Sequence, residues 1–474
     1  MKTKTLTKIL IFAVSALFVL TAAVGVKTTD KASAASVRTL KIANCEDYIY
    51  VDEDTGKNLA DTFAEYYKET YGEEIRVEYS TFSTPEDLYT NMKINPSIYD
   101  VMCPSDYMIE KMAREGMLQK ITLAENGAYN TYVSPFIKEK FEEVTWTAGN
   151  GEENLSQYAA GYMWGTLGLV YNAAKVNDDD MTSWSSLWSG KFDGKFTIKD
   201  SVRDSYFITL AKVYEDELNA LDKNAENYNE KLTEIFNRTD AETVGKVKTA
   251  LKDLKSKCWG LEVDSGKNDV VTGKIDIYFA WSGDAVYAMD EAEEEGVILN
   301  YSVPDEGSNI WFDGWCVAKN SQNADLAKAF IDYISMPENV INNMDYIGYV
   351  SCIGGEEVFD YVHDTYDDEE GDTEFDLSYF FKSGEDDDAD YIVQSTALRQ
   401  LSAQYPSLEV INRCAVMNYF ADEANSRIND MWTEVSTSSG CSSAINADAG
   451  IYVLALFLAA GVIFGLKKTY DKKR

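Results

Sequence analysis

The chain has 474 residues, enough for two or three domains of ordinary size, and it carries 80 Asp+Glu against 43 Lys+Arg, for a formal net charge of −37. This charge argues against nucleic acid as a partner, and the single histidine, His363, nearly excludes Ser-His-Asp, Cys-His and multi-histidine metal chemistry. The seven cysteines are odd in number and form no C-x-x-C pair, so neither a zinc site nor a complete disulfide framework is predicted.

Residues 1–34 have the features of a secretory signal peptide. Met1 to Lys8 contains three lysines and no acid, Ile9 to Val26 is apolar, and Ala32-Ser33-Ala34 forms a small-x-small cleavage site. An uncleaved amino-terminal helix is the alternative. We therefore expect the rest of the chain to be extracytoplasmic.

From Thr39 onward, strand and helix signals alternate. Leu40 and Ile42 begin a short strand, and a helical repeat from Leu59 to Tyr71 ends at Gly72. Further along, Thr84-Pro85 provides a helix cap followed by proline at the first position. This alternation predicts an α/β fold with a mostly parallel sheet, in which ligands sit beyond the carboxyl ends of the strands.

Four acids follow predicted strands, each close to an aromatic or basic residue. They are Asp47 beside Tyr48, Asp106 beside Tyr107, Asp204 after Arg203, and Asp313 within Trp311-Phe312-Asp313-Gly314-Trp315. A buried carboxylate needs a cation or strong donors, and a small organic cation would place its ammonium on Asp313 and its methylenes on the rings. For any single acid, a helix cap or a core aromatic cluster is the alternative. Paired carboxylates among aromatics also suit glycoside hydrolysis.

Two later segments are read differently. Residues 356–391 are dense in acid but lack the twelve-residue calcium-loop spacing, so we interpret them as a solvated insertion with His363 on a surface loop. Val416 to Trp432 is predicted to be the closing amphipathic helix.

The carboxyl-terminal segment is typical of a membrane anchor. Residues 449–466 form an uncharged run which, as a helix, would be roughly 27 Å long, close to the ~30 Å bilayer core. Lysines and an arginine dominate the tail at 467–474, which favours a cytoplasmic location. We predict a linker at 436–448 and a transmembrane helix at 449–466; a buried soluble helix is the alternative.

Several short stretches together make the chain recognisable. They are Asn44-Cys45-Glu46-Asp47-Tyr48, Tyr99 to Tyr107, Glu115 to Leu118, Trp184 to Trp188, Asp200 to Asp204, Trp281 to Ala285, Trp311-Phe312-Asp313 and Ile347-Gly348-Tyr349. In this order and spacing, the sequence resembles the spermidine/putrescine-binding proteins of bacterial polyamine ABC transporters. The resemblance covers about residues 38 to 350, with a weaker carboxyl-terminal part.

The resemblance implies a two-lobed periplasmic-binding-protein fold of type II with an interlobe cleft. Lobe 1 would comprise residues 37–157 and 313–357, and lobe 2 residues 158–312 and 358–435. The expected function is capture of putrescine or spermidine and delivery to an ABC permease. No catalytic residue, metal or cofactor is expected, and the protein would be a monomer tethered to the cell membrane. A binding protein for another small solute, or a surface glycan hydrolase or adhesin, is the alternative.

The resemblance also implies roles for individual residues. Asp47, Asp204 and Asp313 would bind the amines, Ser105 would be a hydrogen-bond partner, and Asp106 would add an acid. The walls would be Tyr48, Tyr107, Trp281, Trp311 and Tyr349. Two positions depart from the family pattern: Cys45 stands where a Trp is usual, and Ser201 stands where spermidine binders often have an acid. Both departures favour a shorter diamine.

Overall fold

The structure is a computed structural model that describes residues 37–438 except 149, 150, 369, 384–386, 388 and 397. The predicted signal peptide (1–34), most of the linker (436–448), the apolar segment (449–466) and the tail (467–474) lie outside the described residues. Within the described part, no helix combines the length and the apolar character needed to cross a membrane.

The amino-terminal elements alternate as predicted. They are β1 (Arg38–Cys45), α1 (Leu59–Tyr71), β2 (Ile75–Phe82), α2 (Pro85–Ile94), β3 (Val101–Met102) and α3 (Asp106–Arg114). Strand β1 pairs in parallel with both β2 and β3. Helix α1 begins with a capping box at Asn58 and ends at Gly72, whose φ of 71° suits glycine, so the predicted start and stop signals are confirmed.

The large sheet is mixed, so the prediction of a mostly parallel sheet was wrong. Among the described residues it has nine strands, with the order β10-β6-β11-β3-β1-β2 and with β9, β12 and β15 attached beside this path. Strand β6 (Ala159–Asn172) pairs antiparallel with four strands: β9 (Ile277–Trp281), β10 (Leu299–Ser302), β11 (Ser308–Val317) and β12 (Val350–Ser351). The β4–β5 hairpin (Thr145–Ala148 and Gly151–Asn154) precedes β6 and pairs only within itself. The prediction of parallel strands came from the amino-terminal strand–helix alternation, whereas the four partners of β6 all follow it later in the chain.

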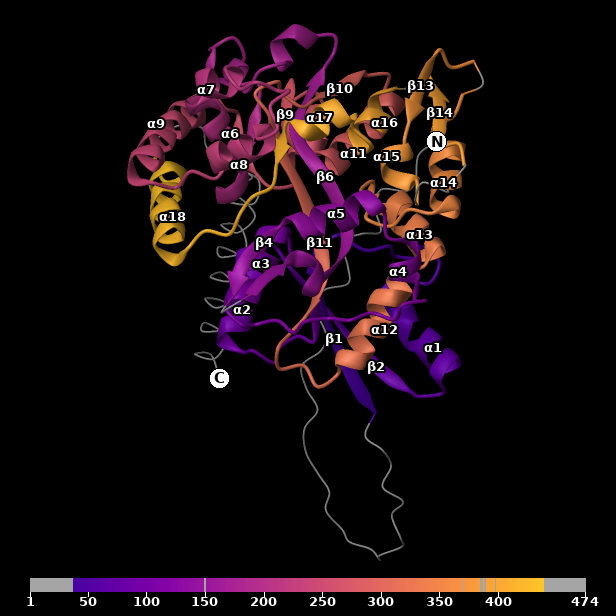
Figure 1. Cartoon of the computed structure of the whole chain (residues 1–474). Coiled ribbons are helices and arrows are strands. Elements are labelled where there is room, and N and C mark those ends of the chain that lie inside the picture. The colour runs from indigo at the N-terminus through magenta and orange to yellow at the C-terminus, as the bar shows by residue number, and fades with distance from the viewer. Residues whose placement is uncertain are drawn as a thin grey trace, which may run out of the picture. The chain divides into compact units, whose positions relative to one another are not determined.

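The remaining elements pack around this sheet (Figure 1). In the middle of the chain they are α4 (Ala128–Tyr132), α5 (Pro135–Glu143), β7 (Thr197–Lys199), α6 (Val202–Val213), α7 (Glu215–Asn219), α8 (Tyr228–Phe236), α9 (Ala241–Lys257), β8 (Gly260–Glu262), α10 (Gly266–Val271) and α11 (Ser282–Glu294). Later ones are α12 (Ala324–Ile334), α13 (Pro337–Ile347), α14 (Glu356–Tyr366), β13 (Thr373–Asp376), α15 (Ser378–Phe381), β14 (Ile392–Ser395), α16 (Leu398–Gln404), α17 (Leu408–Asn412), β15 (Cys414–Ala415) and α18 (Asp422–Ser436). The described residues from Arg38 to Ser438 belong to one compact unit, and the lobe ranges given above stay a prediction.

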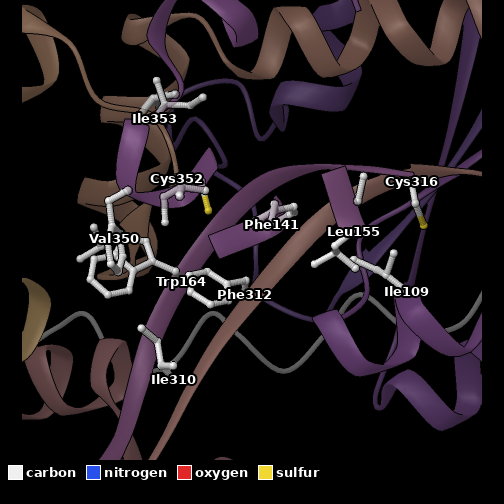
Figure 2. Close-up of a cluster of buried hydrophobic side chains, with 14 of the residues drawn as sticks. Ile109, Phe141, Leu155, Trp164, Ile310, Phe312, Cys316, Val350, Cys352 and Ile353 are labelled. Atoms are coloured by element: carbon white, nitrogen blue, oxygen red, sulfur yellow. The ribbon is translucent and has the colours of Figure 1, made fainter. Parts of the chain in front are cut away.

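Strand β11 alternates between two hydrophobic clusters. Ile310, Phe312 and Cys316 belong to one cluster, where Phe312 lies beside Trp164 (Figure 2). Trp311 and Trp315 belong to another cluster, which contains Tyr48 and the α1 and α12 side chains. All ten residues of β11 are buried. The strand therefore ties two cores together through its two faces.

The acidic segment is not simply a solvated insertion. It forms α14, β13 and α15 and leads into β14, and its Phe359, Phe380 and Phe381 are buried in the same cluster as Trp164. The Phe380 ring stacks on Trp164 with 5.6 Å between centroids. His363 lies in α14 against Phe359 rather than in a loop. The prediction was wrong because the acids dominate the composition, while the few aromatics between them decide the packing.

We expect Phe380→Ala to lower the free energy of unfolding by about 3–5 kcal/mol, since it removes a fully buried ring and leaves a cavity. Urea unfolding at neutral pH measures the change. Leu408→Ala is the control, because Leu408 is 51% exposed and a surface change stays within about 0.5 kcal/mol. A loss below 1 kcal/mol for Phe380→Ala would mean that the segment does not belong to the core.

Candidate functional site

The candidate site is centred on Asp313 in β11. The pairing of β11 with β6 shifts register between Phe312 and Gly314, a bulge of the kind that re-aims a side chain. Asp313 is 7% exposed, and its Oδ2 accepts a 2.8 Å hydrogen bond from the Tyr48 hydroxyl. Its Oδ1 is buried and has no hydrogen-bond partner among the described residues. An acceptor of this kind is costly to leave unpaired, so it marks a place for a donor or a cation.

Burial raises the pKa of Asp313 to about 6, although the nearby hydroxyls of Ser105 and Tyr48 favour the charged form. Ser105 forms a β-bridge with Asp313 from the start of α3. Within the described part, no lysine or arginine lies within ion-pair distance of this carboxylate. The protein therefore holds a poorly compensated acid in its interior.

Three rings surround this acid. Tyr349 lies edge-on to both Tyr48 and Trp311, with centroid distances of 5.5 and 5.6 Å. A Cβ on Gly283 would lie 2.2 Å from the Tyr349 ring, and a Cβ on Gly165 would lie 2.8 Å from the Trp311 ring. Both rings therefore depend on glycine beneath them, which gives a physical reason for Gly283 in the Trp281-Ser282-Gly283-Asp284 stretch.

Asp106, the first residue of α3, is a second buried acid at this place. It is 1% exposed, and its oxygens accept the backbone N–H groups of Phe312 and Tyr107 at 3.0 and 2.6 Å. Burial raises its pKa to about 8, and the neighbouring charge of Asp313 also raises it. Asp106 therefore binds the α3 start to β11 beside Asp313.

Asp204 and Trp281 lie at the other end of the site. Asp204 is buried in the first turn of α6, where its N–H meets the Ser201 cap at 3.4 Å. Burial raises the pKa of Asp204, while Ser201, Lys199 and the Trp281 side chain lower it. Its charge in turn raises the pKa of Asp313, which places the two acids within electrostatic reach of each other.

Asp284 belongs to this end and was missed by the sequence reasoning. Its two oxygens accept hydrogen bonds from Tyr349 at 3.0 Å and from Tyr278 at 2.8 Å. Asp284 sits in the first turn of α11, directly after β9. The signal that pointed to Trp281, an acid and a ring following a strand, was equally present for Asp284 three residues later.

Eight of the ten predicted site residues gather here, and two do not. Asp47 is exposed with a left-handed φ of 51°, and no contact joins its side chain to Asp313 in the described structure. Tyr107 donates to Glu86 at 3.1 Å, and its ring carries the Arg203 guanidinium at 4.2 Å. It lines a separate pocket of about 120 Å³ together with Glu86, Lys111 and Arg203.

The chemistry available is that of a cation site. Carboxylates with raised pKa values, an unpaired buried oxygen and ring faces suit an organic ammonium. Among the described residues, no three His, Cys, Asp or Glu side chains are placed to hold a metal ion.

Residues 59–356 match the family model described as bacterial extracellular solute-binding protein. The spermidine/putrescine-binding periplasmic protein of Salmonella typhimurium is 24% identical over 279 residues, covering 58% of this chain and 70% of that protein. The putrescine-binding periplasmic protein PotF of Escherichia coli is 26% identical over 327 residues, covering 67% and 79%.

Solved structures share the fold. The spermidine/putrescine ABC transporter substrate-binding protein PotD from Streptococcus pneumoniae has a TM-score of 0.54 at 23% identity, covering 84% of this chain and 98% of its own. The TpPotD lipoprotein of Treponema pallidum has a TM-score of 0.57 at 17% identity, covering 84% and 99%. These likenesses support the predicted α/β periplasmic-binding-protein fold.

We expect Asp313→Asn to stabilise the protein at pH 8 by about 2–3 kcal/mol. The pKa of this carboxyl rises from 3.8 unfolded to about 6 folded, so ionisation costs stability as pH rises through this window. The cost is complete above pH 6 and almost absent at pH 4. Urea unfolding at pH 4 and pH 8 measures the difference.

The exposed Asp54 provides the matched control. Asp54→Asn should change the free energy of unfolding by less than about 0.5 kcal/mol at both pH values. An equal effect of Asp313→Asn at pH 4 and pH 8 would contradict the assignment of a raised pKa to this buried acid.

Proposed function

The chain belongs to the family of bacterial extracellular solute-binding proteins, and we propose that it captures a polyamine for an ABC permease. The observation that carries the proposal is the buried Oδ1 of Asp313, which lacks a partner in the described structure while Tyr48, Trp311 and Tyr349 surround the acid. An ammonium on Asp313 would satisfy this oxygen. The methylenes next to it would lie against the rings.

The energies suit a transport receptor. A hydrogen bond to a charged group contributes about 1.5–3 kcal/mol, and a cation over a ring face contributes roughly 0.5–2 kcal/mol. Two or three such bonds and several ring contacts reach the roughly −8 kcal/mol of a micromolar complex after ordering costs. No covalent step is part of this function.

The second amine would lie toward Asp204, whose charge acts on Asp313. The names of the relatives support a polyamine, since two of them are named for putrescine. Asp47 and Tyr107 would reach the ligand only after lobe closure, because neither contacts Asp313 in this structure. Closure of two lobes over the ligand would then present the closed form to the permease.

The segments outside the described residues complete the proposal. Residues 1–34 would direct export, and the apolar run at 449–466 would hold the protein at the outer face of the cell membrane. A tethered receptor stays near its permease, which raises the effective concentration of the loaded form.

Calorimetric titration of residues 35–446 with putrescine, spermidine and spermine is the central experiment. We expect binding of one polyamine in the micromolar range and at least a tenfold weaker affinity for Asp313→Asn, because the amide has no negative charge for the ammonium. Asp54→Asn should bind like the wild type.

Two results would contradict this function. A folded sample that releases no heat with any polyamine would point to another small solute. Hydrolysis of a glycan panel that is lost in Asp204→Asn or Asp313→Asn would make the protein an enzyme.

Membrane attachment has its own test. The full chain expressed with its amino-terminal segment should sediment with membranes and resist extraction by high salt, because burial of an 18-residue apolar helix outweighs surface charge. A chain ending at residue 446 should be released into the soluble extracytoplasmic fraction. Release of both forms would exclude the tether without affecting the ligand proposal.

A further inference from the structure

Lys199 is a fully buried lysine beside the candidate site. It ends β7, and its Nζ donates to the Val263 carbonyl at 2.6 Å and to the Tyr278 hydroxyl at 2.8 Å. The same Nζ lies 3.9 Å from the centroid of the Trp281 ring. The protein therefore places its own ammonium on a ring that is predicted to form a wall of the ligand site.

The acids around Lys199 are neutralised from within the protein. Its Nζ lies 3.6 Å from Asp284 Oδ2 and 3.8 Å from Glu262 Oε1. Asp284 also has Lys267 at 3.9 Å, and both of its oxygens accept tyrosine hydroxyls. This carboxylate already has two hydroxyl donors and two nearby lysines, so it attracts a ligand ammonium less than Asp313 does.

Asp313 and Asp106, at the other end of the site, are not neutralised by a lysine of the described structure. Asp313 has an unpaired oxygen and no ion pair among the described residues, and Asp106 is bonded only to backbone N–H groups. The site thus has two groups of acids. Asp284 and Glu262 have Lys199 beside them, whereas Asp313 and Asp106 have no lysine within ion-pair distance in the described part of the chain. Because Lys199 already supplies a positive charge beside Trp281, Asp284 and Glu262 need less positive charge from a ligand.

We propose that Lys199 is a specificity-determining residue that acts as a built-in cation beside Trp281 and selects a diamine over a triamine. The inference rests on the proposed polyamine function and deepens it. Beyond Asp204, an ammonium directed toward Asp284 or Glu262 would meet the positive charge of Lys199 in buried surroundings. A diamine binds with its charges at Asp313 and Asp204, whereas a third ammonium is repelled.

Ser201 supports the same conclusion from a separate observation. Its side chain caps α6 by accepting from the Asp204 N–H. It carries no charge, so it offers no alternative partner for a third ammonium at this end.

The test is Lys199→Met, which keeps an unbranched side chain of nearly the same length and removes its charge. Calorimetry with putrescine and spermidine measures the ratio of their dissociation constants for wild type and variant. We expect the ratio to shift at least tenfold toward spermidine, since Glu262 would lose its cation and Asp284 would keep only Lys267 at 3.9 Å. Lys195→Met is the matched control, because Lys195 is exposed and pairs only at 3.8 Å with Asp276.

A second variant keeps the test decisive where Lys199→Met does not fold. Glu262→Gln retains the 2.8 Å bond from the Gly266 N–H to its side-chain oxygen and leaves Lys199 less neutralised. We expect it to weaken spermidine binding more than putrescine binding.

The outcomes separate the two proposals. An unchanged ratio, or an equal change for both amines, with diamine binding intact would overturn the role of Lys199 alone. Absence of binding by wild type and all variants would overturn the polyamine function and this inference with it.

Discussion

The burial of the Asp313 carboxylate is the constraint on which the site depends. A charged group removed from water is tolerated only where fixed donors or a counter-ion replace the lost hydration. Tyr48 provides one donor, whereas the second oxygen has no partner in the described structure. The protein thus keeps an acid whose full stabilisation has to come from outside, which is the thermodynamic condition for a receptor rather than for a structural ion pair.

The cost of burying a carboxylate is met differently beside Lys199. Asp284 and Glu262 are as deeply buried as Asp313, but Lys199 lies within 3.8 Å of both. Asp284 and Glu262 are therefore neutralised from within the protein, whereas Asp313 is open to a cation. A lysine is buried beside Asp284 and Glu262, and none is buried beside Asp313 in the described structure. This difference lets a strongly acidic protein discriminate by the number of ligand charges and not only by their sign.

The sequence predicted local features well and distant ones poorly. The helix from Leu59 to Gly72 followed from capping residues and a glycine stop, signals that lie within a few positions of each other. The antiparallel course of β6 did not, because strand direction depends on partners more than a hundred residues away. In the site, Asp313 and Trp311 were predicted from their proximity in sequence, and Tyr48 and Tyr349 from the family resemblance. Asp284 follows a predicted strand and was overlooked, whereas Lys199 became visible only when β7, β9 and α11 were brought together.

Strand β11 explains how such a site is kept rigid. Asp313 lies between Phe312, which is packed in one core, and Gly314, where a Cβ would crowd the backbone of Ala160 at 3.1 Å. Because neighbouring residues on a strand point to opposite faces, the packing of Phe312 against Trp164 fixes the backbone that aims Asp313. Part of the conformational entropy that a flexible site would lose on binding is therefore lost already on folding. A preorganised, buried acid of this kind has a raised pKa, and its ionised form lowers the free energy of unfolding of the empty protein. A bound cation removes this cost, so the cost contributes to the binding free energy.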